Sequence, residues 1–218
     1  MNRAERRSAA PTRAELQAQA KRRRIVLVAS FVVLAAVILI AVVLASRVPP
    51  AATQAPNTAQ LSVGAQAPPF AVSTTNGPFD LAKAGGKPTL LEVFATWCPH
   101  CQREVGVLNA LYATYKDRVN FVAVNGSPLA IDNVTAESQA DVINFMTQFH
   151  VQYPLAFDPN LDVAHKYLQS GFPTVVLIGA NGKVQSIGSG EIPHGDMAKA
   201  LDASLAGKKP APKLGIAG

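Results

Sequence analysis

The 218-residue sequence predicts an α/β fold in which helices cover both faces of a central mixed β-sheet. Strand-like and helix-like segments alternate between residues 61 and 207. The run 89–95 is apolar on both faces, as expected of a central strand with helices on both sides. The turn Gly-Ala-Asn-Gly at 179–182 lies between two apolar runs and is typical of a β-hairpin, so the sheet should also contain antiparallel strands.

The other elements of the domain follow at short intervals. The strand 89–95 leads into a helix that begins at Cys98, in which apolar residues recur every three or four positions. The later elements are expected as a strand at 119–124, a helix through 142–149, a short helix opened at Asp158 and running through Tyr167, hairpin strands at 173–178 and 183–187, and a helix at 193–205 that ends at Gly207.

The N-terminal region predicts a membrane anchor. Residues 1–24 carry eight Lys and Arg against two Glu. Residues 25–46 contain no charge and as a helix would be about 33 Å long, enough for a hydrocarbon core of about 30 Å. By the positive-inside rule, we expect 1–24 to be a cytoplasmic basic tail and 25–46 a transmembrane helix, with the domain extracytoplasmic. A cleaved secretory signal is the alternative, and it would also export the domain.

The remaining segments carry no fold signal. Residues 47–60 form a Pro/Ala-rich linker, and 208–218 are expected to be a disordered tail. From residue 48 onward the chain has eleven basic and twelve acidic residues, so the positive net charge belongs to the N-terminal region. This balance argues against nucleic acid as a partner of the domain.

Cys98 and Cys101 are the chain's only cysteines, and Pro99 and His100 separate them. At this spacing both thiols can lie on the first helical turn and join reversibly as a disulfide. Pro99 suits the first helical position, which places Cys98 at the helix cap, where the helix dipole favours a thiolate. His100 adds a group that can carry positive charge. The pattern predicts a redox-active disulfide in which Cys98 is the nucleophile and Cys101 resolves the mixed disulfide.

Two other uses of the cysteine pair remain as alternatives. Zinc normally takes four ligands, and the sequence shows no second ligand pair, so we expect no metal and no other cofactor. A static structural disulfide would stabilise little, because the loop that it closes is so short. Covalent haem attachment is excluded, since Gln102 rather than His follows Cys101.

Four further sequence features accompany the cysteine pair. They are the entry segment 63–70, Phe-Ala-Thr-Trp-Cys at 94–98, Gly-Phe-Pro-Thr at 171–174 and Gly-Lys at 182–183. With these features, residues 61–207 resemble the thioredoxin superfamily, specifically the membrane-anchored TlpA/ResA-like extracytoplasmic oxidoreductases. The resemblance implies a thioredoxin-like fold and a site that includes Trp97.

The resemblance also implies a substrate-binding loop. The Phe172–Pro173 bond should be cis and lie against the cysteine pair, so that Phe172, Pro173 and Thr174 present backbone to an extended substrate segment. The sequence departs from the family at His100, because the family usually has proline directly before its second cysteine. The order Cys-Pro-His-Cys is instead similar to the periplasmic disulfide oxidase DsbA.

Two carboxylates are candidate proton-exchanging groups. Glu92 interrupts the apolar strand, so burial should raise its pKa, and we expect it to shuttle the proton of Cys101; an exposed strand edge is the alternative. Glu104 lies one turn beyond Cys101 and matches an accessory acid of the reductive TlpA/ResA group. Its alternative is a solvated helix residue.

The sequence thus predicts a thiol-disulfide oxidoreductase that exchanges disulfides with exported proteins through Cys98 and Cys101. His100 favours an oxidase, whereas the family scaffold favours a reductase, for example in cytochrome c maturation. A metal-binding or metal-delivery module is an alternative of another class. The expected partners are exported cysteine-containing proteins and a membrane redox protein that recycles the cysteine pair.

Overall fold

Strand β3 (Thr89–Phe94) lies inside the sheet, and all six of its residues are buried. The structure is a computed structural model that describes residues 61–215. In it, β3 pairs in parallel with β4 (Asn120–Asn125) and antiparallel with β6 (Thr174–Ile178), so the predicted mixed sheet is confirmed. The basic tail, transmembrane helix and linker predicted for residues 1–60 lie outside the described residues.

The sheet has seven strands in the order β2-β1-β5-β4-β3-β6-β7. Beyond the three strands above, these are β1 (Ala71–Thr74), β2 (Gly77–Asp80), β5 (Leu155–Ala156) and β7 (Val184–Ser189). The predicted hairpin is β6–β7, and Gly182 takes the left-handed conformation that the turn between them requires. The β1–β2 hairpin and β5 have no counterpart in the predicted elements.

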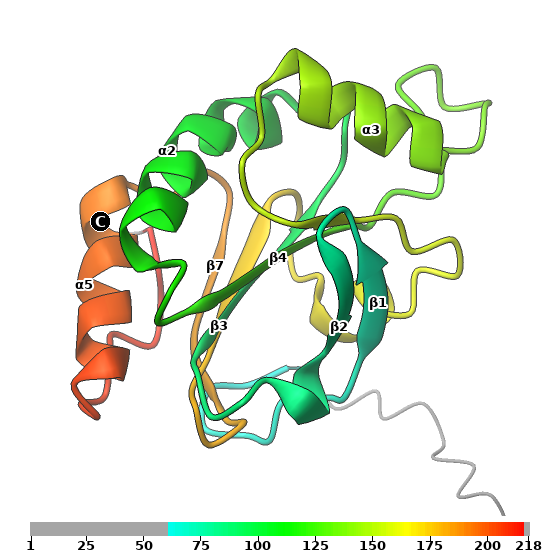
Figure 1. Cartoon of the computed structure of the whole chain (residues 1–218). Coiled ribbons are helices and arrows are strands. Elements are labelled where there is room, and N and C mark those ends of the chain that lie inside the picture. The colour runs from blue at the N-terminus through cyan, green and yellow to red at the C-terminus, as the bar shows by residue number, and fades with distance from the viewer. Residues whose placement is uncertain (1–60, 216–218) are drawn as a thin grey trace, which may run out of the picture. The chain divides into compact units, whose positions relative to one another are not determined.

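Helices cover both faces of the sheet, as predicted. On the face where Leu90 and Phe94 point, the core is completed by α2 (Pro99–Tyr115), α3 (Gln139–Gln148) and α5 (His194–Leu205). Figure 1 shows α2 and α5 side by side on this face. The opposite face packs against α4 (Ala164–Tyr167) and the chain that enters the domain before β1, and the 3-10 turn η1 (Leu81–Lys83) joins β2 to β3.

The short helix α4 begins later than the sequence predicts. The side chain of Asp158 accepts a hydrogen bond from the backbone N–H of Val163 at 2.8 Å, as a helix cap would. Leu161, however, has a φ of 58°, which interrupts a right-handed helix. The helix therefore begins only at Ala164, and the predicted opening at Asp158 is wrong, whereas the predicted end at Tyr167 is correct.

The prediction of a disordered tail at 208–218 is wrong for residues 208–215. Ile187 of β7 donates a hydrogen bond to the carbonyl of Pro212 and accepts one from the N–H of Leu214, each at 3.0 Å. Leu214 is buried against Gly188. A Cβ added at Gly188 would lie only 2.8 Å from the Cβ of Leu214, so a side chain at this position would collide with the leucine. A single leucine in a Lys/Pro/Ala-rich segment gives no periodic signal, yet here it finds the space that a glycine leaves free.

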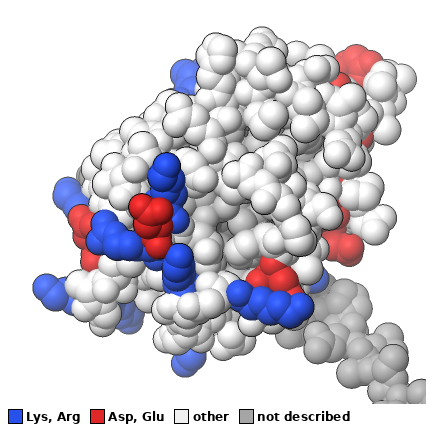
Figure 2. Space-filling model, viewed as in Figure 1, with Lys and Arg blue, Asp and Glu red and all other residues white. Residues whose placement is uncertain are grey.

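The described surface carries a mixture of charges. On the face shown in Figure 2, Lys and Arg lie beside Asp and Glu, and they form no continuous basic surface there. Within residues 61–215, none of the helices has both the length and the apolar character that crossing a membrane requires.

Removing the Leu214 side chain should destabilise the domain. Leu214→Ala is expected to lower the free energy of unfolding by about 2 kcal/mol, because it leaves a cavity between the tail and β7. Urea unfolding measures the change, and the exposed Lys209→Ala serves as the control in the same segment. Equal stability of the two variants would contradict the packing of the tail on β7.

Candidate functional site

The two cysteines lie at the start of α2, as predicted. Cys98 is the N-cap residue with an extended backbone, and Pro99 is the first helical residue. Both thiols are free in this structure, and their exposed fractions are 5% for Cys98 and 1% for Cys101. No side chain caps the first turn of α2, so the N–H groups at its N-terminus, where Cys98 lies, are not paired with a capping side chain. Cys98 is therefore the more accessible thiol, as its predicted role as the nucleophile requires.

The loop before β6 lies against Cys98. The Phe172–Pro173 bond is cis, as the resemblance implies, and the thiol of Cys98 donates to the carbonyl of Phe172 at 3.6 Å. Thr174 is fully buried, and its hydroxyl donates to the carbonyl of Gly171 at 2.8 Å, so its side chain supports the loop from within. Thr174 also pairs with Val93 of β3 and with Ser189 of β7 inside the sheet.

Trp97 joins the cysteine turn to the loop between β4 and α3. Its indole N–H donates to the hydroxyl of Ser127 at 3.1 Å and to the carbonyl of Leu129 at 2.9 Å. Its ring packs edge-on against the ring of Phe172, with centroids 6.1 Å apart. Trp97 thus holds together the two loops that flank Cys98.

Glu137 of the same β4–α3 loop holds the turn before the cysteines. One of its carboxylate oxygens accepts hydrogen bonds from both the backbone N–H and the hydroxyl of Thr96, and the side chain is buried. The other oxygen has no hydrogen-bond partner among the described residues. The turn that carries Trp97 and Cys98 is therefore fixed from outside helix α2.

Glu92 lies inside the core on the α2 face of β3. It is 4% exposed, so the alternative of an exposed strand edge is wrong. Burial raises the pKa of Glu92 well above its ordinary value, and the nearby Glu104 raises it further, while the hydroxyl of Tyr153 partly offsets this by hydrogen bonding. Burial also raises the pKa of Cys101, and the charge of Glu92 adds to that shift. These two groups therefore affect each other's protonation.

Glu104 is the second buried acid, so its alternative as a solvated residue is also wrong. It is 2% exposed, and both carboxylate oxygens accept from the backbone N–H of Ile192, at 3.2 and 3.3 Å. Burial raises the pKa of Glu104 to about 7, against the lowering effect of this hydrogen bond. A carboxyl group with this pKa can gain or lose a proton near neutral pH.

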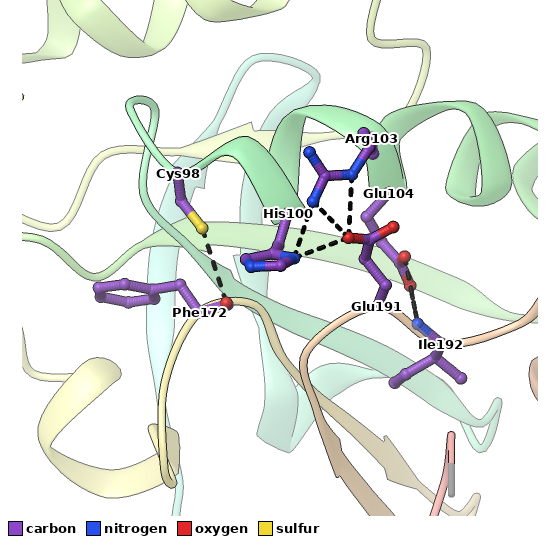
Figure 3. A network of polar contacts seen from close by, with 7 residues as sticks. All are labelled: Cys98, His100, Arg103, Glu104, Phe172, Glu191 and Ile192. Carbon is purple, nitrogen blue, oxygen red and sulfur yellow. Dashed lines mark hydrogen bonds and ion pairs between the residues drawn. The ribbon is translucent and has the colours of Figure 1, made fainter.

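His100 lies at the surface in a three-residue network (Figure 3). Its Nδ1 lies 2.6 Å from Oε1 of Glu191, and the same oxygen accepts from Nε and Nη2 of Arg103 at 2.9 and 2.6 Å. Hydrogen bonds from Arg103 and His100 lower the pKa of Glu191 to about 2. The histidine that the sequence places beside Cys98 therefore has a carboxylate partner.

The structure brings the predicted residues together and adds others that the sequence analysis missed. The cysteine pair, the acids and the cis-proline loop meet around the first half of α2. The residues that were missed are Arg103 on α2 itself and four residues on loops later in the chain: Glu137, Tyr153, Glu191 and Ile192. Only Arg103, three residues after His100, had a signal in its helical spacing. Among residues 61–215, no three His, Cys, Asp or Glu side chains gather as a metal site would need.

Comparisons with known proteins agree with this geometry. A family model described as Redoxin matches residues 62–205. The thiol-disulfide oxidoreductase ResA of Geobacillus thermodenitrificans (strain NG80-2) is 32% identical over 144 residues, which cover 65% of this chain and 78% of the relative. ResA of Bacillus subtilis (strain 168) is 33% identical over 132 residues, covering 60% and 69%.

Solved structures give the same result. The crystal structure of a thiol:disulfide interchange protein of the thioredoxin family from Chlorobium tepidum TLS matches with a TM-score of 0.51 at 29% identity, covering 64% of this chain and 95% of that one. The structure of MTB dsbF matches with a TM-score of 0.53 at 23% identity, covering 62% and 93%, and supports the fold alone.

The raised pKa of Glu104 predicts a stability that depends on pH. Because its ordinary pKa of 4.5 rises to about 7 on folding, the folded chain keeps a proton that the unfolded chain has lost between these values. The free energy of unfolding should therefore fall as the pH rises from about 4.5 to about 7, by up to roughly 3 kcal/mol, and then level off.

Urea unfolding of the reduced protein between pH 5 and pH 8 measures this fall. Glu104→Gln has no proton to lose and should show a smaller fall, with the remainder contributed by Glu92, whose pKa is also raised. The pKa of Glu191, about 2, lies outside this pH range. An unchanged fall in Glu104→Gln would show that Glu104 does not titrate there.

Proposed function

This chain belongs to the Redoxin family and is a thiol-disulfide oxidoreductase of the TlpA/ResA-like group of the thioredoxin superfamily, and we propose that it reduces disulfides in exported proteins. The observation that carries the direction is the buried acid Glu92, whose charge raises the pKa of Cys101, together with the buried Glu104, which raises the pKa of Glu92. Negatively charged groups near a cysteine pair disfavour the thiolate, which exists only in the reduced form of the pair. Destabilising the reduced form makes the pair a stronger reductant. The acids therefore favour a reducing pair.

The reaction begins at Cys98. Its thiolate attacks one sulfur of the substrate disulfide, and the other substrate sulfur leaves as a thiolate and takes up a proton. The ionised form of Glu92, a stronger base because burial raises its pKa, then takes the proton of Cys101. The Cys101 thiolate attacks Sγ of Cys98 and breaks its bond to the substrate sulfur, which leaves as a thiolate and takes up a proton. The substrate leaves as a dithiol and the enzyme is left as a disulfide, so two electrons have passed to the substrate.

The substrate is held by the loops that flank Cys98. An extended segment would lie against the loop of Phe172 and Pro173, which the buried Thr174 supports from within, next to the ring of Trp97. Cytochrome c precursors are one suitable substrate class, because haem attachment uses two cysteines with the same two-residue spacing and requires both as thiols. Two electrons must then return to the enzyme from a redox partner in the membrane.

We place this reaction outside the cytoplasmic membrane. The uncharged segment 25–46, preceded by the basic residues 1–24, supports a single-pass anchor with the N-terminus in the cytoplasm. The linker 47–60 would hold the domain away from the bilayer. Anchoring keeps the enzyme near both exported substrates and a membrane electron donor.

Disulfide formation is the second candidate, and one observation favours it. Cys98 caps the 17-residue helix α2, whose first-turn N–H groups receive no side-chain cap. Such a position stabilises a thiolate, which makes the disulfide more oxidising. A positive charge on His100 would strengthen this effect, but the carboxylate of Glu191 lies 2.6 Å from its Nδ1 and would offset it, which is why we favour the reductive direction.

The redox state of the cysteine pair in cells distinguishes the two directions. Acid quenching followed by thiol alkylation should find Cys98 and Cys101 mostly reduced if the enzyme is a reductase, because a membrane electron donor would re-reduce their disulfide after each turnover. The same treatment after removal of the electron source is the control. A pair that is mostly oxidised under normal growth would instead support the oxidase.

Substitution of single cysteines tests their roles. Cys101→Ser should accumulate mixed disulfides between Cys98 and exported proteins, because the resolving thiol is missing. Cys98→Ser should trap none, since Cys101 is 1% exposed and has a raised pKa. Non-reducing electrophoresis of whole-cell extracts measures both. Equal trapping by the two variants would mean that the assigned roles are wrong.

A further inference from the structure

The exposed network around Glu191 takes no part in the exchange steps above. A single oxygen, Oε1 of Glu191, receives three hydrogen bonds, one from His100 and two from Arg103. Nδ1 of His100 also lies 2.9 Å from Nη2 of Arg103, so the imidazole contacts both other members of the network. The imidazole of His100 and the guanidinium of Arg103, both on α2, point towards Glu191 (Figure 3).

This network lies within electrostatic reach of Cys98. In Figure 3 the ring of His100 lies between the Cys98 side of the site and Glu191, with Nδ1 on the Glu191 side. The hydrogen bond to Glu191 raises the pKa of Arg103 most, and the charge of Cys98 adds to the rise. Positive groups near a cysteine favour its thiolate, and a carboxylate that pairs with them offsets this effect.

The loop Gly190–Ile192 holds Glu191 in place from both sides. The N–H of Gly190 donates to the carbonyl of Pro173 at 2.8 Å, and the N–H of Ile192 donates to the buried Glu104. Gly190 has a φ of 82°, a conformation that favours glycine, and this turns the chain out of β7. The carboxylate is therefore carried by a segment anchored to the substrate-binding loop and to α2.

We propose that Glu191 is a positioning residue that holds His100 and Arg103 and offsets the positive charge of Arg103, thereby setting the reduction potential of the Cys98–Cys101 pair. The proposal rests on the proposed function, since it explains how a chain with histidine between its cysteines keeps a reducing pair. Glu191 acts through its two partners and touches neither substrate nor sulfur.

The test is the equilibrium of the full-length chain with glutathione. Glu191→Gln frees the positive groups and removes a negative charge, so the thiolate is stabilised and the equilibrium constant for forming the Cys98–Cys101 disulfide should fall. We expect a fall of about twofold to fivefold, the range for half-exposed ion pairs. Arg103→Gln should raise the constant by a similar factor, because it removes a positive charge.

Asp196→Asn provides a matched control for Glu191→Gln. Asp196 is a partly exposed acid in the first turn of α5 that pairs with Lys199 at 3.9 Å, outside the network. The Asp196→Asn variant changes the net charge by the same amount as Glu191→Gln and should leave the equilibrium constant for disulfide formation unchanged. An unchanged constant in Glu191→Gln, an equal shift in Asp196→Asn, or shifts of one sign in both Glu191→Gln and Arg103→Gln would each overturn the proposal.

The two proposals fail separately. The direction of the reaction is judged from the redox state in cells, whereas the role of Glu191 is judged from the shift of each variant against its parent in vitro. A pair found oxidised in cells, together with the expected shift in Glu191→Gln, would overturn the reductase and keep the role of Glu191.

Discussion

Ionisable groups are buried in an apolar core at low cost only while they stay neutral. Between β3 and α2 this chain buries three such groups, Glu92, Cys101 and Glu104, and burial raises the pKa of each. Any negative charge placed on one of them is opposed by the others. This constraint keeps Cys101 protonated at rest and ties its reactivity to the nearby carboxyl groups, so the arrangement of the sheet and α2 determines the chemistry at the surface.

Much of the fold could be predicted from local patterns. The apolar run of β3, the helical spacing of α2 and the Asn-Gly turn between β6 and β7 each depend on neighbouring residues alone. β1 and β2 form a hairpin of only four residues per strand, and β5 has two residues that pair with β1 and β4 from far along the chain, so none of the three forms a local pattern long enough to predict it. Leu161 and Leu214 show the same limit. The positive φ of Leu161 delays the start of α4, and the burial of Leu214 orders a tail that the sequence pattern predicts to be disordered.

The site divides in the same way. Cys98, Cys101, His100 and Glu92 could be identified because they lie in one short stretch around the β3–α2 junction. Glu191 and Ile192 reach α2 from 88 residues away, and Glu137 reaches Thr96 from 41 residues away, so only the folded chain brings them together. Glu191 pairs with the charged Arg103 near Cys98, so an electrostatic influence on the cysteine pair comes from a residue that no local sequence pattern connects to it.

The packing of the tail on β7 has a consequence for assembly. β7 is an edge strand, and an uncovered edge can pair with an extended segment of another chain. Here Ile187 already exchanges hydrogen bonds with Pro212 and Leu214, so this edge is partly occupied by the chain itself. The C-terminal segment therefore discourages another chain from adding a strand at this edge, and with it the edge-to-edge association of two copies of the domain.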